Sequence, residues 1–470
     1  DMPDMPDIEE PERLVELHDE PLEPVCPDTA EPVVLYMSND DSNSQASPTI
    51  VRRLIHEGHV VAPDRVRIHE FLNYYTIATD HPIDKPATLG MQMRRTNPET
   101  GEFTLLLTAK GQQLREEQRP PLNLVFSLDT SGSMSGERIE LVKDSMRALA
   151  GELRSGDVIS MVEWSSGQSV LLQDHAVSGP DDPQLLAAID GMQADGSTNL
   201  HAGLVTAYQI AQTSYIEGGI NRVILMSDGG ANAGVTDTEI IAQAAAAEDG
   251  SGIYLVGVGV GTASGYSDQL MDKLTDAGKG AYVFVDSPAE AELQFSERFL
   301  SNVAVAARNV SMRVTLPWYF GVKSFHGEEY SADPAEVEPQ HLAPNDAMSF
   351  HQIIAACDPG SIDAADKIEA HIEYLHPLTL EPMSETVGIA LGALVKADAD
   401  QLHKADVVVG FAKALIVIGA YRQNQMFEEA LDVAEDMKTW LTTAAQQLGD
   451  PEVMEMAALM GEYATVLAIP

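Results

Sequence analysis

The chain has 470 residues, of which 44% are hydrophobic, so it can build a sizeable core and wholesale disorder is excluded. Its 73 acidic residues against 28 basic ones give a formal charge of -45, which argues against binding to nucleic acid or to anionic membrane surfaces. Two cysteines, Cys26 and Cys357, exclude a disulfide framework; a single bridge between them and two buried free thiols both stay open.

The composition of residues 1–120 changes along their length. Residues 1–32 form an acidic, proline-rich arm, which we expect to be extended. Residues 33–120 follow with a strand at 33–37, the polar loop SNDDSNSQASP (38–48), helices within 48–58 and 64–75, and short strands between 87 and 118. The chain begins with Asp1 rather than Met, and we expect that an export signal has been removed.

Residues 121–300 alternate between apolar runs and helical spacing. The expected strands are 122–129, 157–164, 221–228, 252–260 and 281–286, and the expected helices are 137–153, 183–192, 200–215, 238–249, 267–278 and 288–303. Strands that alternate with helices in this way predict an α/β fold with a doubly wound, mostly parallel, Rossmann-like sheet.

The remainder returns to strands and ends in helices. Residues 301–397 contain strand-like runs at 308–318, 348–357 and 366–378, and residues 398–470 read as a helical C-terminal region. Strand-rich pieces thus flank the α/β segment on both sides, which predicts a β-rich domain with the α/β domain inserted in it. No apolar run reaches the ~20 residues that span a bilayer, and the longest, 407–420, is interrupted by Lys413.

Three polar clusters follow expected strand ends or precede a helix. Asp129, Ser131 and Ser133 form a DxSxS pattern after the first strand, Thr198 lies in a GSTN loop, and Asp228 lies in the SDGG loop (227–230). In open α/β sheets, ligands bind at the carboxyl ends of the strands. Two carboxylates and three hydroxyls offer only oxygen, which selects Mg²⁺, Ca²⁺ or Mn²⁺. Because few carboxylates bind it directly, the ion keeps its attraction for an outside carboxylate.

These three motifs, in this order, resemble the von Willebrand factor type A (VWA) domain and its metal-ion-dependent adhesion site (MIDAS). The resemblance implies that Ser131 and Ser133 bind the metal directly, and that Thr198 does so either directly or through water. It also implies that Asp129 and Asp228 act mainly through water. Mg²⁺ is the expected ion, with Ca²⁺ and Mn²⁺ as alternatives.

The flanking sequence is similar to a narrower group. PTIVRRLIHEGHVVAPDRVRIHEFLNYY (48–75) and ARNVSMRV (307–314) resemble bacterial exported VWA proteins of the YfbK type, many of which are lipoproteins. The similarity covers about 45–450. It implies a location in the periplasm or at the cell surface, with a lipid anchor on a removed N-terminal segment as one form of attachment.

The sequence gives less support to catalytic roles for the same residues. Phosphotransfer by Asp129 would need a second acid two residues on, where Ser131 stands instead, and no GxSxG elbow supports a serine hydrolase. The run Gly257-Val-Gly259-Val-Gly261 has the wrong place and spacing for dinucleotide binding and predicts close backbone packing.

Asp157 and the cluster around Asp40 also have simple structural interpretations. Asp157 fits a helix-to-strand turn. Asp40, Asp41 and Asn43 could hold a second cation, although a solvated loop is the simpler interpretation.

The predicted function is therefore non-catalytic: a metal-dependent protein-interaction module for adhesion or assembly, whose metal completes its coordination with an acidic residue of a partner protein. One alternative is a structural subunit of a cell-surface assembly, with self-assembly as one form of it, in which the metal only stabilises the fold. The other is a metal-dependent hydrolase.

Overall fold

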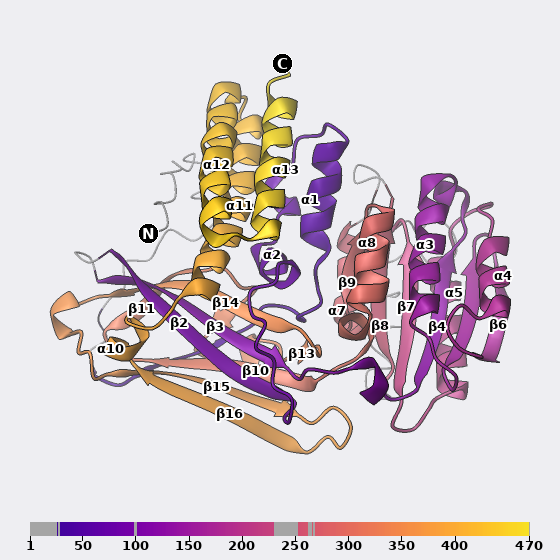
Figure 1. Cartoon of the computed structure of the whole chain (residues 1–470), viewed down its shortest axis with the longest axis horizontal. Helices are drawn as coiled ribbons and strands as arrows, with labels where there is room; N and C mark the ends of the chain where they lie inside the picture. Colours follow the sequence, from indigo (N-terminus) through magenta and orange to yellow (C-terminus); the bar gives the residue numbers. More distant parts are fainter. Residues whose placement is uncertain are drawn as a thin grey trace. The chain divides into compact units, whose positions relative to one another are not determined.

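The computed structural model describes residues 26, 29–97, 101–229, 252–261, 266 and 268–469. They fall into two compact units, and Figure 1 shows the elements of each. The first unit contains Asp1–Ser42, Val51–Gln112 and Ala306–Pro470; the second contains Asn43–Ile50 and Gln113–Val305. The second unit is thus inserted within the sequence of the first.

The second unit is built on one sheet with the strand order β6-β5-β4-β7-β8-β9 among the described residues. Neighbouring strands run parallel, except that β6 is antiparallel to β5. The strands are β4 (Leu122–Asp129), β5 (Val158–Trp164), β6 (Gln168–Ala176), β7 (Ile220–Ser227), β8 (Tyr254–Val260) and β9 (Tyr282–Val285). The expected doubly wound, mostly parallel sheet is confirmed.

Helices cover both faces of this sheet, which explains why every residue of β4 is buried. The helices are α3 (Glu137–Gly151), α4 (Pro183–Gly191), α5 (Leu200–Thr213), α7 (Asp268–Gly278), α8 (Pro288–Glu292) and α9 (Phe299–Val303). Side chains of α3, α4 and α8 share one core with Leu124 and Phe126 of β4. In contrast, α5 packs against β4, β5 and β7 with residues outside that core.

Two sequence expectations differ from this unit, and a third is not tested. The edge strand β6 was not expected, because most of its side chains are exposed and it lacks an apolar run. The single helix expected at 288–303 is divided by a π-helical turn, Leu293–Glu297, between α8 and α9. The helix expected at 238–249 lies outside the described residues.

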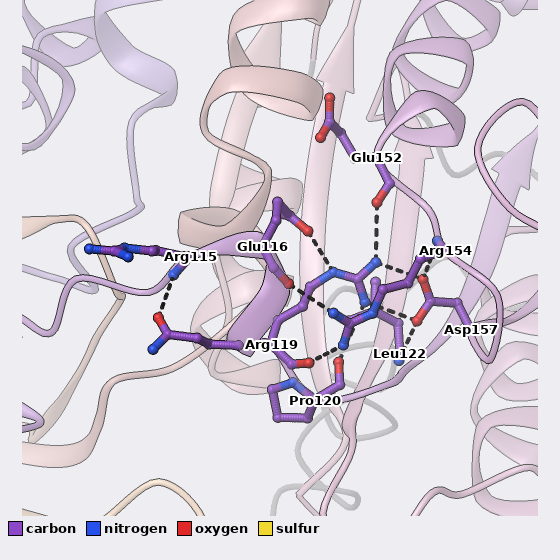
Figure 2. Close-up of polar contacts among 9 residues, drawn as sticks. Arg115, Glu116, Arg119, Pro120, Leu122, Glu152, Arg154 and Asp157 are labelled. Atoms are coloured by element: carbon purple, nitrogen blue, oxygen red, sulfur yellow. Dashed lines mark hydrogen bonds and ion pairs between the residues drawn. The ribbon is translucent and has the colours of Figure 1, made fainter.

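A buried charge network holds the start of β4 (Figure 2). Arg119 binds Asp157 through two hydrogen bonds, Nη1 to Oδ1 at 2.9 Å and Nη2 to Oδ2 at 2.7 Å, and both side chains are fully buried. The backbone N–H groups of Leu122 and Arg154 donate to the same carboxylate. Asp157 is therefore more than the simple turn residue that the sequence suggested: it is the anion of a buried ion pair.

The first unit contains two antiparallel sheets that share one core. One has the order β12-β1-β10-β15-β16, with β13 also pairing with β10, and the other has the order β11-β14-β3-β2. The strands are β1 (Val33–Met37), β2 (Ala87–Asn97), β3 (Glu102–Gly111), β10 (Ala307–Leu316), β11 (Phe320–Phe325), β12 (Tyr330–Ser331), β13 (Gln340–Leu342), β14 (Ala347–Ala356), β15 (Lys367–Leu375) and β16 (Pro382–Ala390). The segments before and after the insertion thus pair with each other, as β1 does with β10.

Helices complete the first unit. They include α2 (Ile68–Tyr74), α10 (Leu391–Leu394), α11 (Asp400–Gln423), α12 (Phe427–Leu448) and α13 (Pro451–Leu467), and α1 (Ala46–His56) begins at the junction of the two units. The last three pack on one another, and α2 and α11 contact β14 (Figure 1). No helix in the described ranges combines the length and apolar character that crossing a bilayer requires.

Cys26 and Cys357 form a disulfide, with their Cα atoms 5.3 Å apart. Both cysteines belong to the first unit, and the sequence between them, a separation of 331 residues, contains the whole second unit. It resolves the two alternatives that the sequence left open.

Candidate metal centre

The candidate site lies at the carboxyl edge of two neighbouring strands of the second unit. Asp129 is the last residue of β4, and Asp228 directly follows β7, which pairs with β4. Thr198 lies just before α5, whose N-cap Asn199 accepts a hydrogen bond from the Ala202 N–H. Strand pairing and helix capping therefore place these side chains at one edge of the sheet, where α/β folds bind ligands.

Hydrogen bonds join the three polar loops to one another. Gly132 N–H donates to the Gly196 carbonyl at 3.0 Å, and Asp195 N–H donates to the Thr130 carbonyl at 2.8 Å. The Ser227 hydroxyl, at the end of β7, donates to Asp129 Oδ2 at 2.7 Å. Gly196 has φ +83°, a conformation that favours glycine. The loops are thus fixed relative to one another by contacts within this unit.

The two serine hydroxyls lie side by side in the loop that follows Asp129. Ser131 Oγ and Ser133 Oγ are 3.0 Å apart, and the Ser131 N–H donates to Asp129 Oδ1 at 2.9 Å. Both carboxylate oxygens of Asp129 therefore already accept a hydrogen bond from the protein. This arrangement suits a carboxylate that orients neighbouring groups and meets an ion through water.

Burial makes the negative charge at this edge costly. Asp129 is fully buried, Thr198 is 2% exposed and Asp228 is 5% exposed. Burial is the largest influence on Asp129 and raises its pKa to about 6, with a further upward contribution from Asp228; the bonds from Ser227 and Ser131 oppose the shift. Two buried carboxylates that repel each other favour a cation beside them.

Among the described residues, the cationic side chain of Arg138 contacts this edge of the sheet. Arg138, in the first turn of α3, donates from Nη1 to Asp228 Oδ2 at 2.8 Å and to the Ser133 carbonyl at 2.7 Å. The motifs gave no reason to expect Arg138, and Ser227 belongs to the SDG motif but was not among the expected ligands. The only signal for Arg138 would have been its position one helical turn beyond the serine loop.

The donor set fits a hard divalent cation. The side chains of Asp129, Ser131, Ser133, Thr198 and Asp228 offer oxygen only, as the sequence predicted. Three of the five are linked by hydrogen bonds, since Asp129 accepts from the Ser131 N–H and Ser131 Oγ lies beside Ser133 Oγ. Such an ion would supply a positive centre able to bind a carboxylate.

The glycine run in β8 and the loop around Asp40 were also considered as sites in the sequence. Gly257 and Gly259 lie within β8, where an added Cβ would come within 2.4 Å of Thr275 and 2.1 Å of Tyr266, so close packing explains both glycines. Asp41 accepts a hydrogen bond from the His341 N–H, and Asn43 donates one to the Ser301 carbonyl.

Comparisons with known proteins agree with the fold and the motifs. Residues 123–298 match the family model of the von Willebrand factor type A domain, and residues 35–102 match a second model, described as von Willebrand factor. The chain therefore carries a von Willebrand factor type A domain.

The narrower resemblance is also confirmed. The chain is 32% identical over 311 residues to YfbK of Escherichia coli (strain K12), covering 64% of this chain and 52% of that protein. It is 24% identical over 383 residues to sll0103 of Synechocystis, covering 81% of each chain. The chain spans about half the length of the Escherichia coli relative. Among solved structures, a von Willebrand factor type A protein from Catenulispora acidiphila matches with a TM-score of 0.48 and 14% identity, covering 77% of this chain and 88% of that one.

Proposed function

We propose that the type A domain binds a divalent cation, chiefly Mg²⁺, at Asp129, Ser131, Ser133, Thr198 and Asp228, and that this ion binds an acidic residue of a partner protein. Type A domains are protein-interaction modules, and the proposal adds metal dependence and the chemistry of the partner. Ca²⁺ and Mn²⁺ are alternative ions with the same preference for oxygen.

The observation that carries the proposal is the convergence of the serine pair with buried carboxylates at one sheet edge. Ser131 Oγ and Ser133 Oγ lie 3.0 Å apart, and Asp129 behind them is held by two hydrogen bonds. An ion bound mainly by neutral hydroxyls keeps most of its charge. A carboxylate from outside can then complete its coordination with a strong charge-assisted contact.

We also propose that the protein acts without catalysis and outside the cytoplasm, in the periplasm or at the cell surface. A site that binds its ion through hydroxyls and water suits the capture of a carboxylate. The Cys26–Cys357 disulfide supports an oxidising compartment, since such bridges persist mainly in exported proteins. Attachment through a lipid is an expected form of this location, as in the resembling bacterial group.

Replacing a serine of the pair tests the proposal directly. We expect Ser131→Ala to abolish Mg²⁺ binding in calorimetry and to abolish Mg²⁺-dependent retention of a partner from the native envelope, because one direct ligand is lost. Circular dichroism should be unchanged, since Ser131 contributes a hydroxyl at a loop.

Ser135→Ala is the matched control. Its hydroxyl donates to the Gly132 carbonyl at 2.8 Å on the exposed side of the same loop, so Mg²⁺ binding should persist. An unchanged Mg²⁺ affinity in Ser131→Ala would refute the assignment. Partner retention that survives both chelation and Ser131→Ala would favour the structural-subunit alternative.

Arg138 provides a prediction of opposite sign. We expect Arg138→Met to tighten Mg²⁺ binding by about tenfold, ~1.4 kcal/mol, because a positive charge 2.8 Å from Asp228 Oδ2 opposes a second cation. Calorimetry on the two proteins measures the change. Arg147→Met, on the same helix but paired with Asp144 and Asp190, controls for lost charge and should leave the affinity unchanged. Weaker binding in Arg138→Met would instead assign Arg138 the role of positioning Asp228.

A further inference from the structure

A second group of metal-ligating side chains lies in the first unit. Asp40 follows β1, while His69 and Glu70 lie in the first turn of α2. One donor atom from each, a carboxylate oxygen or a ring nitrogen, lies within 4.8 Å of the other two. The sequence placed Asp40 in a candidate cation loop but gave no reason to join it to α2.

Neighbouring contacts hold Asp40 against α2. The side chain of Asn73, one turn further along α2, donates to the carbonyls of Asn39 and Asp41, both at 3.1 Å. The Asn39 amide donates to Asn73 Oδ1 at 2.9 Å. The residues on both sides of Asp40 are therefore tied to the same short helix. The convergence of Asp40 with His69 and Glu70 follows from this local structure.

This loop is buried, contrary to the solvated loop that its polar sequence suggested. Ser38, Asn39 and Ser42 are 1%, 0% and 0% exposed, and Asp41 is 9% exposed. Such a run of polar side chains needs partners, because burying an unsatisfied polar group costs about 1–3 kcal/mol. The loop finds them in β13 and α2: Gln340 Oε1 accepts from the Asn39 N–H at 3.0 Å.

His69 is the part of the group that ordinary packing does not explain. Its ring makes no hydrogen bond with any residue that the structure describes, although two carboxylates lie near it. A ring nitrogen beside two carboxylates is a suitable metal ligand.

Glu70 adds a charge that cannot reach water. Its side chain is 0% exposed and pairs with Arg67 through one carboxylate oxygen. In metal sites, ligating carboxylates are themselves hydrogen-bonded, and such outer partners fix the orientation of the ligand. Arg67 can serve in this way for Glu70.

We propose that Asp40, His69 and Glu70 bind a transition-metal ion of the zinc class, which fastens the loop after β1 to α2. One nitrogen and two carboxylate oxygens suit Zn²⁺, Mn²⁺, Fe²⁺ or Co²⁺ better than the all-oxygen preference of Mg²⁺ and Ca²⁺. Donors bonded to one zinc ion at about 2.0–2.1 Å lie within about 4.2 Å of one another, which is compatible with donor atoms that are all within 4.8 Å of each other. Water would supply the fourth ligand. The site is independent of the type A metal centre.

Co²⁺ serves as the spectroscopic probe. It is added to the full chain, which carries no affinity tag and has been stripped of metal, in the presence of excess Mg²⁺. We expect Asp129→Ala to retain one Co²⁺ whose X-ray absorption spectrum shows a nitrogen ligand. His69→Gln in the same background should weaken that binding by more than the 10–100-fold typical of outer-shell changes. His59→Gln is the matched control, because His59 is also close to a carboxylate, Glu57 at 3.7 Å, but lies outside the group; it should retain the site.

Retention of Co²⁺ in Asp129→Ala separates this site from the type A metal centre, so either assignment can fail alone. Equal Co²⁺ affinity in His69→Gln and His59→Gln would overturn the proposal. If circular dichroism shows that His69→Gln does not fold, the proposal is tested by the X-ray absorption spectrum of Co²⁺ bound to Asp129→Ala, in which His69 is intact. A nitrogen ligand then supports the site, and coordination by oxygen alone overturns it.

Discussion

Asp157→Ala is expected to lower the free energy of unfolding of the second unit by about 3–5 kcal/mol, the cost of removing one partner of a buried ion pair. The substitution would leave the Arg119 guanidinium, fully buried, without its bidentate carboxylate. Burial disfavours the charged form of Arg119, but the bonds from Asp157 outweigh it and raise the guanidinium pKa above its usual value. Arginine keeps its charge at neutral pH even without this partner, because its ordinary pKa lies far above 7, and this makes the loss large.

The same carboxylate also satisfies two backbone groups. Leu122 N–H donates to Asp157 Oδ1 at 3.0 Å and Arg154 N–H to Oδ2 at 2.9 Å, so the substitution leaves both donors without this acceptor (Figure 2). Leu122 opens β4, the central strand that ends at the candidate metal centre. Unfolding in urea, followed through the fluorescence of buried Trp164, measures the change in this unit.

Asp144→Ala is the control for this prediction. Asp144 pairs with Arg147 on the surface, where both side chains are more than a third exposed, and such pairs contribute about 0–1 kcal/mol. A combined Arg119→Met and Asp157→Leu replacement should recover much of the lost stability, since an apolar pair of similar volume often substitutes for a buried ion pair. Equal losses in Asp157→Ala and Asp144→Ala would contradict the prediction.

The fold was predictable where burial leaves a clear pattern of apolar residues in the sequence. β4 is buried throughout, and its continuous apolar run marked its bounds, Leu122–Asp129, to the residue. β6 and β16 carry mixed polar sequences because they lie at sheet edges with much of their surface exposed. Such strands have little to distinguish them from loops until their neighbour is known.

The candidate site was predictable where its residues adjoin the ends of strands. Asp129 and Asp228 lie beside the ends of paired strands, so their common edge follows from the order of the elements. Arg138 meets Asp228 across 90 residues of sequence, and Asp157 meets Arg119 across 38. These pairings depend on packing in three dimensions, and no local pattern records them. The same holds for Asp40 and His69.

Gly203→Ala is expected to destabilise the type A domain by about 2 kcal/mol or more, although alanine is normally the better helix residue by about 1 kcal/mol. Gly203 lies in the first turn of α5, where an added Cβ would sit 2.0 Å from Trp164 Cδ1. The indole cannot easily withdraw, because it is 1% exposed and its Nε1–H donates to Ser127 Oγ at 3.0 Å. The helix must therefore move away from β5.

That movement should reach the candidate metal centre. Thr198 lies two residues before α5 begins, and the Trp164 carbonyl accepts from the Thr130 N–H at 3.0 Å. We expect Gly203→Ala to weaken Mg²⁺ binding in calorimetry as well as to shift the urea transition. Gly151→Ala, at the end of α3 with nothing within 4 Å of its added Cβ, should leave Mg²⁺ binding unchanged and raise stability by up to about 1 kcal/mol. Unaltered stability in Gly203→Ala would contradict this prediction. It would mean that the Trp164 ring can move aside, and that close contact between α5 and β5 does not hold the Thr198 loop in place.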